Sequence, residues 1–478
     1  MAEATRKPNI LFITTDQQRW DTVGAYGRGH VRTPCLDRLA GEGVLFERAY
    51  AQNVVCIPSR ACMQTGRYTH QHGVRYMEDE IDLTPGLPAH EVTVMKRLQE
   101  AGYVTGATGK IHMMPERDFD WMEIVGGKGA RWTQSTGLPI GPAPLGAQYA
   151  AWVEAREPGA YERIYAQRRQ PDYKRNICSM VNCLPLELYV ETYILEKSIE
   201  FIRANKERPF FLWCGFCGPH GPHDPPASHA NLYDPREVEL PATLGADLSG
   251  KPRHIAGRAQ PELARRDGGM AYRRYMAWYY CLCTLIDEYV GKLVDTLRRE
   301  ALLDNTLIVY VSDHGEMLGD YDMYGKGNFY EPVSRVPMIA RPPGGCARRR
   351  VGRVAETMDV AATFLDYAGV AQPREMQARS FRPALEAGEY GHEAALSEYT
   401  TNDQKINGKC LVTERFKYVY WDAGEGGELY DLAEDPLERR NLYYEGSHRE
   451  TRDRMAEMLL ERLMQSERGY LGGREGHY

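Results

Sequence analysis

Asn9-Ile-Leu-Phe-Ile-Thr-Thr-Asp16 is the stretch that decides the fold, because it is an apolar run that ends in an acid. A short run without polar alternation predicts a strand that is buried on both faces of a parallel sheet. Thr306-Leu-Ile-Val-Tyr-Val-Ser312 repeats the pattern and is followed directly by Asp313. Since sites in open α/β sheets form beyond the carboxyl ends of the strands, we expect Asp16 and Asp313 to meet at that edge.

The segments between these two strands alternate between helical and extended patterns. This alternation predicts an α/β fold with a β-sheet flanked by helices. Gly126–Gly159 is rich in Gly and Pro and has no clear period, so we expect a long loop over the site. The predicted helices are 33–43, 59–65, 92–101, 188–205 and 272–299, and the predicted strands are 44–51, 102–109 and 209–216.

The pattern changes after about Gly369 and predicts a smaller C-terminal α+β subdomain with an antiparallel sheet. Lys409–Trp421 alternates like an exposed strand, and Glu428–Asn441 has the composition of an acidic turn segment. Glu450–Glu467 has the pattern of an amphipathic helix, which suggests a self-interface and a homo-oligomer. The predicted domains are therefore residues 1–370 and 371–478.

Composition excludes several classes of protein. The 478 residues are 43% hydrophobic and 26% charged, as in ordinary globular chains, and the net charge of −7 argues against generic nucleic-acid binding. No apolar run is long enough to cross a bilayer, and Met1–Pro8 lacks the pattern of a secretory signal. Eleven scattered cysteines favour reduced thiols. We therefore expect a cytoplasmic protein with neither a membrane nor a nucleic acid as partner.

The strand-end acids are the first chemical signal, and His314 follows the second one directly. Carboxylates with one imidazole can form a site for a divalent metal ion. A single Asp at a strand end is more often a cap or turn residue, so the pair gains weight only beside a reactive group.

Cys56-Ile-Pro-Ser-Arg60 supplies such a group. The cysteine lies just ahead of a predicted helix, whose N-terminus attracts anions, and Arg60 adds a bidentate donor. From these residues alone, a buried structural cysteine and a low-pKa thiolate nucleophile both remain open.

Taken together, these segments resemble the type I sulfatases, which are formylglycine-dependent enzymes of the alkaline phosphatase superfamily. Their signature, Cys-x-Pro-Ser-Arg followed by Thr-Gly-Arg, matches Cys56–Arg67. The resemblance runs in order along nearly the whole chain, and its further segments are Asn9–Gln17, Gly102–His112, Pro219-His220, Ser312–Glu316, Gly325-Lys326 and Glu428–Leu442.

The resemblance implies that a formylglycine-generating enzyme oxidises Cys56 to formylglycine, whose hydrate attacks the substrate and forms a covalent sulfo-enzyme hemiacetal. Residues 1–370 would then be the catalytic α/β domain, built on a large mixed β-sheet flanked by helices. One divalent metal ion would be held by Asp16, Gln17, Asp313 and His314, together with the hydrate at Cys56.

The same resemblance implies roles for the remaining site residues. Arg60 and Lys110 would fix the hydrate and the anion, and Lys326 would bind the ester oxygens. His220 would protonate the leaving oxygen with help from Lys326. His112 would then take the proton from the second hydroxyl of the covalent ester.

Gln17 and His314 depart from the pattern of many sulfatases, which have a second acid and an Asn at these positions. Gln and His also occur there in choline sulfatases and phosphonate monoester hydrolases. Because the site loses a carboxylate and gains an imidazole, Mn²⁺ competes with the Ca²⁺ that is usual in the family. Lys110 and His112 are typical of sulfatases, whereas Asp313–Pro337 is more similar to the phosphonate hydrolases.

Three functions remain open on these residues. The first is hydrolysis of small-molecule sulfate monoesters, and the alternative is hydrolysis of phosphonate monoesters or phosphodiesters, with activity toward both possible. The third is a non-catalytic metal-binding protein with an unmodified Cys56, which would leave Lys110, His112, His220 and Lys326 without a role. The alcohol half of the substrate depends on loops such as Arg75–Asp82 and Gly126–Gly159.

One further motif has two interpretations. Cys214-Gly-Phe-Cys217-Gly-Pro-His220-Gly-Pro-His223 has the residue types of a zinc or redox site. Phe210–Phe216 is a predicted strand, however, and residues three apart on a strand point to opposite faces. We therefore prefer the hydrolase site for His220.

Overall fold

The computed structural model describes residues 7–75, 86–113, 116–125, 148–401, 403 and 405–468. Its strands are β1 (Asn9–Asp16), β2 (Val44–Tyr50), β3 (Val104–Gly109), β4 (Trp121–Ile124), β5 (Phe210–Pro219), β6 (Thr306–Ser312), β7 (Arg335–Val336), β8 (Met338–Arg341), β9 (Arg349–Glu356), β10 (Ala394–Thr400), β11 (Asn407–Thr413), β12 (Phe416–Trp421) and β13 (Gly426–Asp431). Its helices are α1 (Pro34–Gly41), α2 (Cys56–Thr65), α3 (Thr69–His72), α4 (Val94–Glu100), α5 (Gln148–Arg156), α6 (Ala160–Arg168), α7 (Pro171–Arg175), α8 (Val190–Ala204), α9 (Arg253–Ala256), α10 (Pro261–Arg265), α11 (Met270–Arg299), α12 (Glu331–Ser334), α13 (Asp359–Ala368), α14 (Arg382–Glu386) and α15 (Arg449–Arg468).

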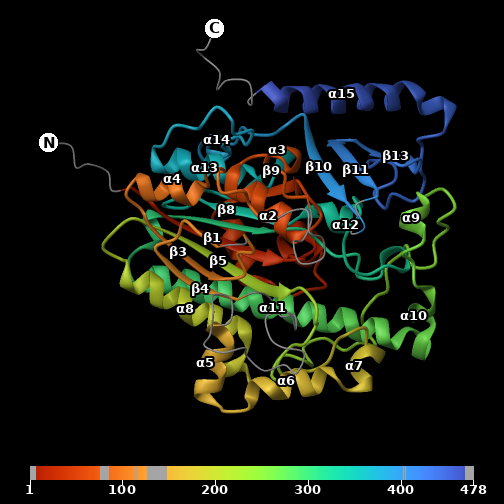
Figure 1. The fold of residues 1–478 in the computed structure, drawn as a ribbon. Helices are drawn as coiled ribbons and strands as arrows, with labels where there is room; N and C mark the ends of the chain where they lie inside the picture. The colour runs from red at the N-terminus through yellow and green to blue at the C-terminus, as the bar shows by residue number, and fades with distance from the viewer. Residues whose placement is uncertain are drawn as a thin grey trace, which may run out of the picture.

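A mixed sheet forms the centre of the molecule (Figure 1). Among the described residues it has nine strands in the order β4-β3-β5-β1-β6-β8-β2-β7, and β9 pairs with β2. The strands from β4 to β6 are parallel, whereas β8 is antiparallel to both β6 and β2. This arrangement confirms the predicted α/β class with a large mixed sheet. In the described part of the chain, no helix combines the length and apolarity that a membrane span requires.

Strand β1 lies at the centre of the sheet, and all of its residues are buried. Ile10 and Phe12 pack into the core shared with α2, α4 and α13. Leu11 and Ile13 pack on the opposite face, against side chains of α1, α8 and α11. Figure 1 shows α8 and α11 on one side of the sheet and α4 and α13 on the other. Because both faces of β1 are covered, its sequence lacks the polar alternation of a half-exposed strand.

The register of β1 and β6 brings the two strand-end acids together. The strands are parallel, with Thr15 opposite Ser312, and the Asp313 N–H donates to the Thr15 carbonyl oxygen at 3.2 Å. Asp16 and Asp313 therefore leave neighbouring strands at the same edge of the sheet, as the sequence pattern predicts.

Helix α2 begins earlier than predicted. We expected a helix from Ser59 with Cys56 just ahead of it, but Cys56 is the first residue of α2. The Asn53 side-chain oxygen accepts a hydrogen bond from Val55 N–H at 3.0 Å and fixes the chain where it enters the helix. Pro58 lies in the first turn, where its missing N–H has no helical partner to lose. Cys56 is therefore held by helical backbone geometry.

Three other predictions of local structure were wrong. Lys409–Trp421 forms two antiparallel strands, β11 and β12, instead of one. Strand β13 covers the first four residues of the segment predicted as an acidic turn, where Glu428 is buried and accepts a hydrogen bond from the Trp421 indole at 2.9 Å. Helix α5 occupies part of the segment predicted as a long loop over the site, and residues 126–147 of that segment lie outside the described residues.

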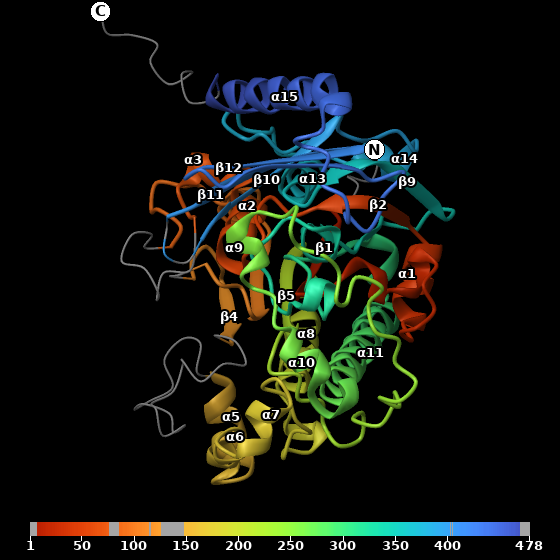
Figure 2. The same ribbon diagram turned by 90° about the vertical axis from the view of Figure 1, so that its right-hand side faces the viewer.

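The C-terminal part forms the predicted antiparallel sheet, in the order β10-β11-β12-β13. Figure 2 shows α15 lying across this sheet, and α15 forms the helix that the amphipathic pattern predicts. Leu396 and Leu411 belong to the same apolar cluster as Phe12 of the main sheet, so the C-terminal sheet packs on the main core. The division at residue 370 stays a prediction.

We predict that Gly215→Ala destabilises the protein by about 1–3 kcal/mol, as overpacking typically does. A Cβ atom at Gly215 would lie 2.2 Å from the carbonyl oxygen of Lys110, where β5 passes the end of β3. Gly41→Ala is the matched control, because a Cβ atom there meets nothing within 4 Å. Urea unfolding of both variants checks this. An unchanged midpoint for Gly215→Ala would show that the two strands can move apart without loss of stability.

Candidate active site

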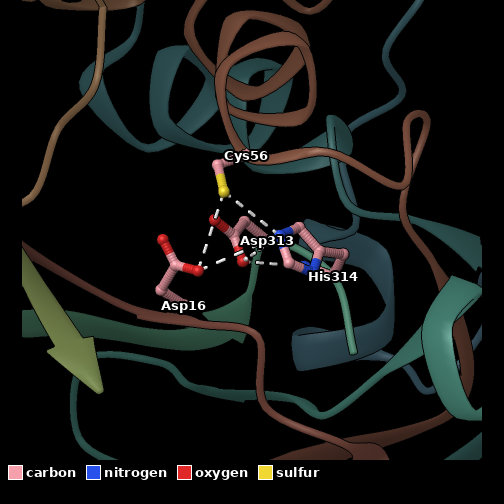
Figure 3. Close-up of side chains that lie close together, drawn as sticks. All are labelled: Asp16, Cys56, Asp313 and His314. Atoms are coloured by element: carbon pink, nitrogen blue, oxygen red, sulfur yellow. Dashed lines mark hydrogen bonds and ion pairs between the residues drawn. The ribbon is translucent and has the colours of Figure 1, made fainter. Parts of the chain in front are cut away.

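Four buried side chains converge at the carboxyl ends of β1 and β6 (Figure 3). Asp16 and Asp313 come from the strand ends, His314 follows Asp313, and Cys56 comes from the first turn of α2. Cys56 Sγ lies 3.3 Å from His314 Nε2 and 3.7 Å from Asp16 Oδ1. The reactive atom of the predicted nucleophile therefore lies among the predicted metal ligands.

Arg60 joins α2 to the two acids. Its guanidinium is fully buried, and Nε donates to Asp313 Oδ2 at 2.8 Å, while NH2 lies 3.4 Å from Asp16 Oδ2. Its NH1 donates to the Lys110 carbonyl oxygen at 2.6 Å. Ser59 in the same helix donates to the Asp313 carbonyl oxygen at 2.6 Å. The contacts of Arg60 thus position the acids, and the substrate contact predicted for it stays a prediction.

Two lysines face the site from separate loops. Lys110 Nζ forms an ion pair with Asp16 Oδ2 at 2.5 Å and lies 3.9 Å from Cys56 Sγ. Lys326 Nζ lies 2.6 Å from Cys56 Sγ and 3.1 Å from His314 Nε2. The site therefore gathers positive charge around residue 56.

These charges outweigh burial in their effect on pKa. Burial alone raises the pKa of the Cys56 thiol, but Lys110, Lys326 and His314 lower that pKa well below its usual value. Burial also raises the pKa of Asp16, as does the Cys56 thiolate, yet Lys110 and the neighbouring cations hold the pKa of that carboxyl below its usual range. Negative charge is thus favoured on both side chains.

Gln17 is oriented by a residue to which the sequence analysis gave no role. Its Nε2 donates to Glu316 Oε2, whereas its Oε1 is buried and has no hydrogen-bond partner among the described residues. Glu316 Oε1 accepts hydrogen bonds from Leu318 N–H at 3.1 Å, from the Tyr275 hydroxyl at 3.3 Å and from Gly325 N–H. Glu316 therefore fixes both the amide of Gln17 and the turn that precedes Lys326. The motif Ser312–Glu316 was the available signal, although it does not reveal these partners.

The donor atoms fit a divalent metal ion. His314 Nδ1 donates to the Gly315 carbonyl oxygen at 2.9 Å, which leaves the Nε2 lone pair for a ligand. Two carboxylates and the unpartnered Gln17 Oε1 supply oxygen atoms, as hard cations require. A buried polar atom without a partner is costly, and a bound cation would satisfy it.

A second buried group has the residue types of a metal site and consists of Glu356, Asp359 and His392. Its ligand atoms, however, are engaged in hydrogen bonds with one another and with neighbouring groups. Asp359 Oδ2 lies 2.8 Å from His392 Nε2 and accepts from Glu356 N–H at 3.1 Å. Glu356 Oε2 accepts from the Tyr68 hydroxyl at 2.8 Å. This group is a closed hydrogen-bond network that joins α13 to Tyr68, which directly precedes α3.

The two predicted acid–base histidines are both half-buried. His220 is one-third exposed, its Nδ1 donates to the Gly221 carbonyl oxygen at 2.7 Å, and its Nε2 lies 4.0 Å from Asp16 Oδ1. Burial, followed by the charge of Lys110, lowers the pKa of His112 to about 4. His112 is therefore neutral near pH 7 and able to accept a proton.

The zinc interpretation of the Cys214–His223 motif has no support in the described residues. Cys214 and Cys217 lie on β5, and neither belongs to a group of metal-type ligands. Cys214 Sγ instead accepts a hydrogen bond from the Ser198 hydroxyl at 3.3 Å. The predicted specificity loops, Arg75–Asp82 and Gly126–Gly159, lie largely outside the described residues.

The fold and the buried site are those of an α/β protein with a cluster of metal-type ligands around Cys56. Residues 8–370 match the model of the sulfatase family, and residues 319–465 match the model named N-sulphoglucosamine sulphohydrolase, C-terminal. The chain belongs to the sulfatase family and is an enzyme of the sulfuric ester hydrolase class.

Known proteins similar to this chain agree with that assignment. An arylsulfatase of Clostridium perfringens is 28% identical, over 98% of this chain and 96% of the relative. An N-acetylglucosamine-6-O-sulfatase of Bacteroides thetaiotaomicron is 26% identical, over 96% and 87%. The crystal structure of the phosphonate monoester hydrolase of Agrobacterium radiobacter shares the fold, with a TM-score of 0.79 and 23% identity over 96% of both chains.

Proposed function

We propose that this protein is a formylglycine- and metal-dependent sulfatase that hydrolyses small-molecule sulfate monoesters. The observation that carries this proposal is the position of Cys56, in the first turn of α2 and among Asp16, Asp313 and His314. Maturation would require a formylglycine-generating enzyme, and we retain a homo-oligomer as the expected assembly.

In this proposal Sγ of Cys56 marks the place of the formylglycine hydroxyls. The hydrated aldehyde would supply an oxygen nucleophile, and a divalent cation, Ca²⁺ or Mn²⁺, would increase its acidity. Asp16, Gln17, Asp313 and His314 would hold the cation. Arg60 would keep Asp16 and Asp313 in place, since its guanidinium contacts both.

The remaining residues would bind the anion and move protons. Lys110 and Lys326 would stabilise negative charge on the sulfate oxygens, because both ammonium groups lie within 4 Å of Cys56 Sγ. His220 lies at the exposed side of the site and would donate a proton to the departing alcohol oxygen. His112, with its lowered pKa, would accept the proton in the step that releases sulfate.

The second candidate function is hydrolysis of phosphonate monoesters or phosphodiesters. Gln17 and His314 favour it, since both occur at these positions in phosphonate monoester hydrolases, and one such enzyme shares the fold. A protein that processes both kinds of ester is compatible with the same residues.

The preferred substrate is tested with a pair of esters that share one aryl leaving group, a sulfate and a phosphonate. We expect kcat/KM to be higher for the sulfate with protein whose Cys56 has been converted, because Lys110 and His112 match the sulfatase pattern. A higher kcat/KM for the phosphonate would establish the second candidate instead.

The Gln17–Glu316 contact predicts that a substitution at Glu316 lowers metal affinity and that a second substitution, at Gln17, restores it. In Glu316→Gln, the side-chain oxygen of the new amide must accept the hydrogen bonds from the Leu318 and Gly325 N–H groups. The NH₂ group of that amide therefore faces Gln17. The Gln17 amide then turns its own NH₂ toward the cation, and metal affinity falls by about 10–100-fold. Adding Gln17→Glu restores it, because one carboxylate oxygen accepts from residue 316 while the other binds the metal.

Equilibrium dialysis with Ca²⁺ and Mn²⁺ measures this without reference to activity. Tyr275→Phe is the matched control, because it removes a single 3.3 Å contact to Glu316 and should leave the affinity nearly unchanged. Wild-type affinity in Glu316→Gln, or no recovery in the double variant, would refute the orientation of Gln17.

The two histidines are distinguished by a series of leaving groups. His220→Ala should slow esters of weakly acidic alcohols far more than activated aryl esters, because an activated aryl oxide departs without a proton. His112→Ala should slow turnover equally for all leaving groups, with a burst of alcohol followed by slow release. A steep dependence on leaving-group pKa in His112→Ala alone would mean that the two roles are reversed.

A further inference from the structure

Four of the six ligand-atom separations around unmodified Cys56 are close to those of a tetrahedral zinc site, and all six are within 4.8 Å. Zinc bonds of about 2.3 Å to sulfur and about 2.0–2.2 Å to nitrogen or oxygen place neighbouring tetrahedral ligands roughly 3.4–3.6 Å apart. Cys56 Sγ lies 3.3 Å from His314 Nε2 and 3.7 Å from Asp16 Oδ1. His314 Nε2 lies 3.6 Å from Asp313 Oδ1 and 3.9 Å from Asp16 Oδ1.

The orientation of the ligands agrees with these separations. Figure 3 shows the four side chains directed toward a common centre, with the sulfur on the side of α2. His314 donates from Nδ1 to a backbone carbonyl, the usual arrangement of a zinc-bound histidine that coordinates through Nε2. All four side chains are buried, so a bound ion would be shielded from water.

We propose that the chain with unconverted Cys56 binds Zn²⁺ through Asp16, Cys56, Asp313 and His314, and that conversion of Cys56 changes the metal preference. Zinc takes the place of the Lys326 ammonium beside the Cys56 thiolate, and a zinc–sulfur bond forms without any change of oxidation state. Conversion removes the sulfur and leaves oxygen donors with one imidazole, a set that suits Ca²⁺ or Mn²⁺. The zinc site itself is independent of the proposed function, whereas the change of preference rests on the proposed formylglycine.

Lys326 opposes the ion in a way that can be measured. Its Nζ lies 2.6 Å from Cys56 Sγ and 3.1 Å from His314 Nε2, so this ammonium group occupies the edge between two of the ligands. Zinc must displace it. Lys326→Met, which removes the charge and shortens the side chain by one atom, should therefore bind zinc more tightly than the unsubstituted chain.

The experiment uses full-length protein from a host without the activating enzyme, with an unmodified Cys56 verified by mass spectrometry. Cys178 and Cys183 are exposed and are replaced by serine throughout, so that surface thiols bind no metal. Co²⁺ is the spectroscopic probe, because a bound thiolate gives an intense near-ultraviolet charge-transfer band. We expect one Co²⁺ per chain with this band, and its displacement by Zn²⁺ but not by Ca²⁺.

Cys56→Ser should abolish the band and lower zinc affinity on the order of 100-fold or more, beyond the loss seen for supporting residues. Cys62→Ser is the matched control, because Cys62 is a buried cysteine of the same helix outside the ligand group and should change neither property. Co²⁺ bound without the band, no bound metal, or wild-type zinc affinity in Cys56→Ser would overturn the proposal.

The converted protein gives a separate readout. It should show no thiolate band and should prefer Ca²⁺ or Mn²⁺ over Zn²⁺ relative to the unconverted chain. An unchanged preference would overturn the proposed switch even if the converted protein hydrolyses sulfate esters. If the unconverted protein binds zinc as expected but the converted protein hydrolyses no sulfate ester, the proposed function alone is refuted.

Discussion

The repulsion between Asp16 and Asp313 is the constraint on which the rest of the site depends. The two carboxylates are fully buried at the ends of adjacent parallel strands, where neither is solvated by water. Arg60 compensates both of them from α2, and Lys110 compensates Asp16 from the end of β3. Removing one partner of such a buried pair typically costs about 3–5 kcal/mol, so the acids and cations depend on one another.

This compensation also determines where the nucleophile lies. Arg60 is four residues beyond Cys56, so the same turn of helix that neutralises the acids directs Cys56 toward them. Ser59 binds the Asp313 carbonyl oxygen and secures the contact between α2 and β6. The position of residue 56 thus follows from the charge balance of the strand ends.

Much of the fold could be predicted because β1 and β6 are buried on both faces, which leaves an uninterrupted apolar pattern. The meeting of Asp16 and Asp313 followed from the parallel direction of these strands. Glu316 was missed because Gln17 and Tyr275, two of its partners, are distant in the sequence. Glu428 was assigned to a turn because its buried aromatic hydrogen-bond donors are visible only in three dimensions.

Sulfate and phosphonate monoesters each carry one negative charge at neutral pH, so the cations at the site attract both. Besides the ester oxygen, the sulfur or phosphorus atom carries three substituents, and the third of these is an oxygen in a sulfate and a carbon group in a phosphonate. Discrimination between the two substrates must depend on the space around that substituent. Both functions nevertheless require the same nucleophile at residue 56.

The most direct test of the account is therefore the state of residue 56 compared with activity. Peptide mass spectrometry over residues 49–60 gives the fraction of formylglycine in preparations made with different amounts of activating enzyme. The account predicts that kcat for a sulfate ester rises in proportion to that fraction and vanishes when it is zero. Full activity in protein that carries only the unmodified Cys56 thiol would contradict it.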